Sequence, residues 1–214
     1  RDRIVVSKGH AGVGVAPTLA KVGFFDKDLL KDFNHFNSPF GMHLDSLKVP
    51  GLDASTGSLG HGLAQCVGMA WGARFQKKDW KTYCILGDGE CNEGSVWEAA
   101  MAGAHFKLSN LMAFVDRNGL MMDGTTEQVM ALEPLPDKFK AFGWNVQVVD
   151  GHDFNALNDV IELAWSQTHQ PTMVIANTVK GKGVDFMENE IKWHYGSMDS
   201  ALAEKALASI EASA

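Results

Sequence analysis

The stretch TYCILGDGECNE, residues 82–93, joins an apolar run to a Gly-Asp-Gly turn, and a helical pattern follows it. Residues 82–86 are rich in bulky apolar side chains and favour a buried strand. Residues 93–108 have a helical period, with Val96, Trp97, Ala100, Met101 and Ala104 on one side. A second apolar run at 111–115 comes next. Strand, helix and strand in this order predict a βαβ unit with parallel strands.

The same alternation continues outward from this unit. Apolar runs at 146–149 and 172–176 predict two more strands, and residues 155–166 predict a crossover helix between them. Residues 62–75 predict a deeply packed helix whose small residues, Ala64, Gly68, Ala70 and Gly72, allow close backbone approach. We expect a loop that reaches away from the sheet at 179–195 and a terminal helix from 199 onward. The predicted fold is α/β, a parallel sheet flanked by helices, in a single domain 1–214.

Two polar side chains stand at predicted strand ends. Asp88 follows the first strand, and Asn118 follows the next one in Asp116-Arg117-Asn118-Gly119. Ligands of open α/β sheets bind at the carboxyl ends of strands, so we expect Asp88 and Asn118 to lie side by side. Carboxylate, amide and carbonyl oxygens suit Mg²⁺. Asp88 is then a ligand and not a core residue, and its replacement by alanine should change the fold little. The alternative is that both are ordinary turn residues.

Composition excludes several classes of partner. The 214 residues include 19 basic and 26 acidic side chains, a formal charge of -7, which gives no overall attraction to nucleic acid or to an anionic membrane. No apolar run approaches the length of a membrane span. The three cysteines form no CxxC pair, and their odd number favours a reducing compartment, here the cytoplasm. Gly57, Gly60 and Gly62 do not have the G-x-G-x-x-G spacing, which argues against a nicotinamide dinucleotide site.

A Gly-Asp-Gly turn, a helix and a strand that ends in Asn resemble the signature of thiamine diphosphate enzymes. The residues of this segment are similar to those of transketolase. Further segments agree along nearly the whole chain: Ser7-Lys8-Gly9-His10, Gly41-Met42-His43, Ser55 through Gly62, and Lys180-Gly181-Lys182-Gly183 through Trp193-His194. The resemblance implies the diphosphate-binding (PP-type) domain of such an enzyme. It also implies the cofactors thiamine diphosphate and Mg²⁺.

The resemblance assigns roles to individual residues. It makes Asp88, Asn118 and the carbonyl of Leu120 the metal ligands, and it brings Gly89 close to the diphosphate. It places the loop Gly57-Ser58-Leu59 against the cofactor. It places His10 and His194 beside the cofactor and His43 beside the reacting end of the substrate, while His61 stands where many relatives carry glutamine.

The roles of Glu93 and of three lysines each have two interpretations. Glu93 opens the predicted helix after the Gly-Asp-Gly turn, where a carboxylate is favourable in any protein. The resemblance implies that a partner subunit completes the enzyme, and it instead makes Glu93 a hydrogen-bonded link toward the active site of that partner subunit. Lys8, Lys180 and Lys182 could reach a phosphate, but solvated loop lysines are the default interpretation. We therefore expect the partner subunit to supply the anchor for the substrate's phosphate.

The resemblance implies ketol transfer between sugar phosphates through a cofactor-bound enamine. The family also needs a pyrimidine-binding domain, which this sequence lacks, and its natural N-terminal segment is missing before Arg1. We therefore expect the amino-terminal subunit of a split transketolase, active only with a carboxy-terminal partner subunit, in a heterotetramer. The alternatives are a component of a deoxyxylulose-phosphate synthase or 2-oxoacid decarboxylase, or a non-catalytic cofactor-binding module.

Overall fold

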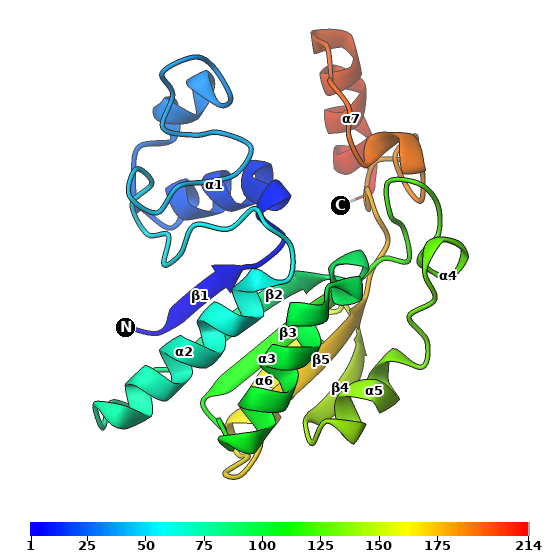
Figure 1. Cartoon of the computed structure of the whole chain (residues 1–214). Helices are drawn as coiled ribbons and strands as arrows, with labels where there is room; N and C mark the ends of the chain where they lie inside the picture. The colour runs from blue at the N-terminus through cyan, green and yellow to red at the C-terminus, as the bar shows by residue number, and fades with distance from the viewer. Residues whose placement is uncertain (214) are drawn as a thin grey trace.

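The fold is a parallel α/β sheet with helices on both faces, as predicted (Figure 1). The computed structural model describes residues 1–213. Five parallel strands lie in the order β1-β2-β3-β5-β4. They are β1 (Arg3–Val6), β2 (Thr82–Gly87), β3 (Leu111–Arg117), β4 (Asn145–Asp150) and β5 (Thr172–Asn177). The four predicted strands are confirmed, each slightly longer than its apolar run, whereas β1 was not predicted as a strand.

The helices divide between the two faces of the sheet. Residues of α2 (His61–Phe75), α3 (Gly94–His105) and α5 (Leu135–Ala141) form the main core with one face. Residues of α6 (Phe154–Trp165) pack against the other face, where Val160 and Ala164 contact Met112 and Val174. The remaining helices are α1 (Gly12–Lys21), α4 (Thr126–Val129) and α7 (Ser200–Ser213), and 3₁₀ turns span Gly9–Ala11, Lys27–Asp32, Gly89–Asn92 and Ile191–Trp193.

The small residues of α2 do not lie where we expected. The buried side of α2 holds Leu63, Cys66, Val67, Ala70 and Ala73, a spacing of three to four residues. Ala64 and Gly68 fall on the opposite, exposed side, and Gly72 is only partly buried. The prediction was therefore right for Ala70 alone. Met101, which the helical period puts on the same side of α3 as Val96 and Ala100, is 52% exposed, whereas those two residues are buried.

A separate lobe, formed by α1 and the residues that follow it, comes after β1 and carries His43. Its own small core contains Ala16, Leu19, Phe40, Leu44 and Val49. In Figure 1 this lobe, coloured blue to cyan, stands beyond the carboxyl end of β1. At that same edge of the sheet, residues 179–195 run away from β5 toward α7, as predicted. No helix among the described residues is long and apolar enough to span a membrane.

Candidate diphosphate and metal site

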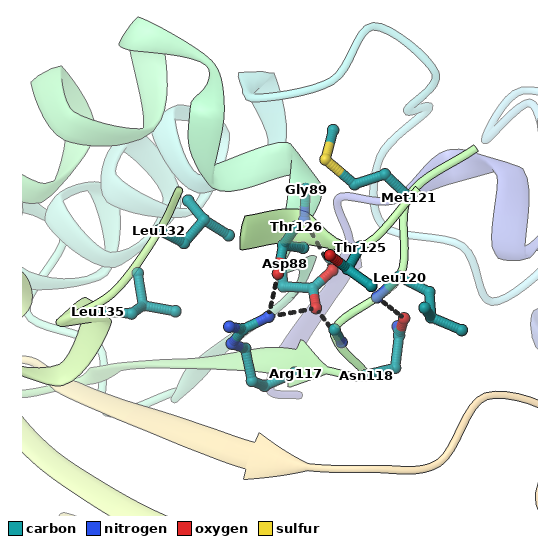
Figure 2. Close-up of polar contacts among 12 residues, drawn as sticks. Asp88, Gly89, Arg117, Asn118, Leu120, Met121, Thr125, Thr126, Leu132 and Leu135 are labelled. Atoms are coloured by element: carbon teal, nitrogen blue, oxygen red, sulfur yellow. Dashed lines mark hydrogen bonds and ion pairs between the residues drawn. The ribbon is translucent and has the colours of Figure 1, made fainter. Parts of the chain in front are cut away.

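Asp88 is a buried carboxylate at the end of β2, only 2% exposed. Its Oδ1 accepts a hydrogen bond of 2.7 Å from the Gly89 amide, and its Oδ2 accepts one of 2.6 Å from the Gly119 amide beyond β3 (Figure 2). Gly87 and Asp116 are register partners in β2 and β3, so Asp88 and Asn118 do stand at neighbouring strand ends. The expectation that Asp88 is not part of the core was wrong, because three donors hold it in the interior.

The third donor is Arg117, whose role the sequence did not reveal. Its Nη1 lies 3.1 Å from Asp88 Oδ2 and donates at 2.7 Å to the buried Thr126 hydroxyl. Its Nη2 donates to Glu127 at 3.1 Å and to Glu133 at 3.0 Å. Burial lowers the pKa of Arg117. The hydrogen bonds to Glu133 and Asp88 together have a larger, opposite effect, so the pKa of Arg117 is raised. Arg117 thus ties the Asp88 carboxylate to the segment that carries α4.

The predicted oxygen ligands converge in a tight loop after β3. Asn118 Oδ1 accepts a hydrogen bond of 3.1 Å from the Leu120 amide, and Leu120 pairs with Thr125 in an isolated bridge (Figure 2). Residues 1–213 contain no cluster of three or more His, Cys, Asp or Glu side chains suited to a metal. A metal bound here would therefore use amide or carbonyl oxygens beside the single carboxylate. Among the described residues one hydrogen bond reaches Asp88 Oδ1, from the Gly89 amide, so this oxygen retains acceptor capacity for the metal.

The structure brings His10 and His194 together from distant parts of the chain. Their ring centroids are 6.0 Å apart, and the planes are inclined by 26°. Burial and the charge of Lys8 lower the pKa of His10, and burial and the charge of Lys180 lower that of His194. His194 Nδ1 is buried and has no hydrogen-bond partner within the described residues. Both rings are therefore neutral near pH 7, and His194 has a nitrogen available for a ligand.

The remaining predicted residues lie around the same edge. A Cβ atom on Gly57 would be 3.3 Å from the His43 ring, so His43 lies against the Gly57-Ser58-Leu59 loop. His61 is the exposed first residue of α2. Glu93 precedes α3 and is exposed, but its side chain makes no capping hydrogen bond. A carboxylate at this helix N-terminus is favourable without such a bond, so both interpretations of Glu93 stay predictions.

Two of the three lysines are not solvated loop residues, which corrects the default interpretation. Lys8 forms an ion pair with Asp116 and is only 19% exposed, and the Thr178 hydroxyl donates to the same carboxylate. Burial and the charge of Lys8 lower the pKa of Lys180. Lys182 alone fits the expectation, because its side chain is 55% exposed and lies 3.5 Å from Glu188. Lys8 and Lys180 thus add positive charge beside the two histidines.

The comparisons with known proteins agree with this geometry. Residues 1–211 match the family described as transketolase, thiamine diphosphate binding domain. The chain belongs to the transketolase family. It is 42% identical to an apulose-4-phosphate transketolase subunit of Phocaeicola vulgatus over 207 residues, which are 97% of this chain and 73% of that protein. It is 39% identical over 211 residues to the 6-deoxy-6-sulfo-D-fructose transketolase subunit SqwG of a Clostridium species, covering 99% of this chain and 77% of the relative.

Solved transketolases share the fold over the same length. The chain superposes on the transketolase of Campylobacter jejuni with a TM-score of 0.92 and 30% identity, covering 99% of this chain but 34% of that one. The chain thus spans about a third of that longer transketolase. Two relatives are named as subunits, which implies a second subunit in their enzymes. The transketolase names favour ketol transfer over the deoxyxylulose-phosphate synthase, decarboxylase and non-catalytic alternatives.

Glu90 is a second residue at this transketolase site that sequence reasoning missed. It is 3% exposed, although it lies two residues after Asp88 in a polar turn where a solvated carboxylate would be unremarkable. The only available signal was a third acidic position in the run from Asp88 to Glu93. Two of its hydrogen-bond partners, Ser7 and Gly60, are distant in the sequence and could not be read from the local pattern.

Proposed function

We propose that this chain holds thiamine diphosphate by its diphosphate, through Mg²⁺ bound by Asp88, Asn118 and the carbonyl of Leu120. The observation that carries the proposal is the convergence of a buried carboxylate and an amide-bearing loop at the carboxyl ends of β2 and β3. Asp88 Oδ1 retains acceptor capacity for the metal, and the fixed network around it means that little reorganisation is needed on binding. Gly89 would bring the backbone close to the diphosphate, and the position has little room for a side chain, since a Cβ atom there would lie 3.0 Å from Met121 Cγ.

The surrounding residues suit a bound anion with a reactive ring. Thiamine diphosphate, when bound, supplies the electron sink that carbon–carbon cleavage beside a carbonyl requires. His10 and His194 are neutral near pH 7 and can each donate one hydrogen bond and accept another. Lys8 and Lys180 offset the negative charge of Asp116 and of a diphosphate. The Gly57-Ser58-Leu59 loop would contact the cofactor, with His43 behind it on the side from which substrate approaches.

The reaction proposed is transfer of a two-carbon ketol unit between sugar phosphates, in carbohydrate metabolism of the pentose phosphate type. The pyrimidine-binding domain would come from a carboxy-terminal partner subunit, in a heterotetramer, and Glu93 would face that partner's active site. The subunit names of the relatives support this division. A cytoplasmic location is supported by three free cysteines, all buried.

The test is calorimetric titration of thiamine diphosphate into the full-length chain, with Mg²⁺ and with chelator. Asn118→Ala is the cleaner variant, because the one side-chain hydrogen bond of Asn118 within residues 1–213 is the local one from the Leu120 amide, whereas the Asp88 carboxylate also holds buried structure together. We expect Mg²⁺ to tighten binding to the natural chain and to have at least about tenfold less effect on the variant, the scale of one lost ligand. Equal Mg²⁺ dependence in both proteins would refute the metal assignment.

A further inference from the structure

The Glu90 carboxylate is a buried junction between three separate segments. Its Oε1 accepts hydrogen bonds from the Ser7 hydroxyl and, at 2.8 Å, from the Gly60 amide. Its Oε2 accepts one from the Gly87 amide at 3.0 Å. Ser7 Oγ in turn accepts a hydrogen bond of 3.1 Å from the Gly62 amide in the first turn of α2. One carboxylate thus joins the end of β1, the start of α2 and the end of β2.

Each of these anchor points stands next to residues of the proposed site. Ser7 precedes the Gly9–Ala11 turn that contains His10. Gly60 ends the loop of residues 57–59, and Gly87 immediately precedes Asp88. The hydrogen bonds of Glu90 within residues 1–213 go to Ser7, Gly60 and Gly87, which lie beside the residues proposed to bind the cofactor and the metal. Its place is therefore behind the cofactor site, not within it.

The end of β1, the start of α2 and the end of β2 are closely packed, so their relative positions depend on the hydrogen bonds of Glu90. A Cβ atom on Gly62 would lie 2.4 Å from Ser7 Oγ, and one on Gly9 would lie 2.5 Å from the Thr56 carbonyl oxygen. Gly60 has a φ of 83°, in the left-handed region that favours glycine. The segments therefore pack closely around the Ser7 and Glu90 side chains, and Glu90 supplies the polar contacts that set their spacing.

Glu90 is held by hydrogen bonds and not by an ion pair. Within residues 1–213 no Lys, Arg or His forms a salt bridge with it, so its negative charge is balanced by two amides, one hydroxyl and the N-terminus of α2. A glutamine at this position would keep the shape, but its NH₂ group would face at least one of the amide donors. The exchange of one oxygen for nitrogen therefore perturbs the junction without removing the side chain.

We propose that Glu90 is a positioning residue that holds the three cofactor-binding segments in register. This inference rests on the proposed function. Asp53 offers a comparison, because its side chain is 3% exposed and it accepts from a β1 amide, that of Ile4 at 3.0 Å, and from Arg1 and Arg3. Asp53 binds the opposite end of β1. Its replacement should therefore lower the stability of the fold without disturbing the segments that bind the cofactor.

The experiment compares Glu90→Gln with Asp53→Asn in the full-length chain assembled with its pyrimidine-binding partner. Thermal unfolding midpoints, dissociation constants for thiamine diphosphate with Mg²⁺, and kcat at saturating cofactor are measured for each protein. We expect both variants to unfold at lower temperature. Glu90→Gln should bind the cofactor about tenfold more weakly, the scale of one charge-assisted hydrogen bond, with kcat within about twofold of the natural enzyme. Asp53→Asn should change cofactor affinity less than about twofold.

Four results would overturn the inference. Glu90→Gln could bind as tightly as the natural protein, or Asp53→Asn could weaken binding equally, which would reduce Glu90 to a general stabiliser. If the natural assembly itself shows no saturable binding, the proposed function fails and the inference falls with it. Should Glu90→Gln not fold, Ser7→Ala keeps the carboxylate and removes one anchor, and it should weaken cofactor binding about threefold. Unchanged affinity in that variant would then be the contradicting result.

Discussion

Replacing Arg117 with methionine should markedly destabilise the chain. The exchange keeps much of the side chain's length and removes its charge, which leaves the Asp88 carboxylate buried without its cation. The two side chains are 12% and 3% exposed. Loss of one partner of a buried ion pair costs about 3–5 kcal/mol.

The other contacts of Arg117 adjust this figure only slightly. Glu127 and Glu133 are 43% and 50% exposed, so each of their ion pairs contributes about 0–1 kcal/mol. Asp88 keeps two backbone donors after the exchange, which reduces the penalty. We therefore expect the free energy of unfolding to fall by about 3 kcal/mol, the lower end of the range for a buried pair.

Urea denaturation followed by circular dichroism measures this change. A double-mutant cycle with Asp88→Ala isolates the pair, and we expect a coupling energy of about 1.5–3 kcal/mol, the value for a hydrogen bond between charged groups. A loss below about 1 kcal/mol in Arg117→Met, or a coupling energy near zero, would refute the reasoning that Arg117 holds Asp88 in place.

Two further predictions concern the histidine pair and α2. Because the folded state lowers the pKa of His10 and His194, the stability they contribute is complete above the ordinary histidine pKa of about 6.5 and is lost as pH falls below it. Lys180→Met should raise both pKa values in an NMR titration, and unchanged values would contradict the proximity of Lys180. Gly68→Ala should raise the free energy of unfolding by about 0.5–1 kcal/mol, because nothing lies within 4 Å of the added Cβ. Gly62→Ala should lower it by about 1–3 kcal/mol through overpacking, and equal effects of the two exchanges in urea denaturation would contradict the assigned faces of α2.

The strand-end argument predicted much of the site because it depends on topology alone. Apolar runs identify the strands, and parallel order then brings Asp88 and Asn118 to one edge, as the register of β2 and β3 confirms. The edge strand β1 escaped prediction because it has only four residues and its apolar run, Ile4-Val5-Val6, is only three residues long.

Arg117 and Glu90 could not be found from the sequence because their roles depend on partners far along the chain. Glu90 lies 83 positions from Ser7, and no local period links them. The faces of α2 were misjudged for a related reason, since small size alone does not show which side of a helix is buried. The positions of Leu63 and Val67 carried that information.

The central claim is that this chain forms the diphosphate-binding half of a transketolase that a partner subunit completes. The direct test is turnover of a ketose phosphate by the full-length chain with thiamine diphosphate and Mg²⁺, with and without that partner, alongside the mass of the complex. We predict no ketol transfer by the chain alone, and activity with the partner in a complex of at least two copies of each. Robust turnover by the chain alone would contradict the claim.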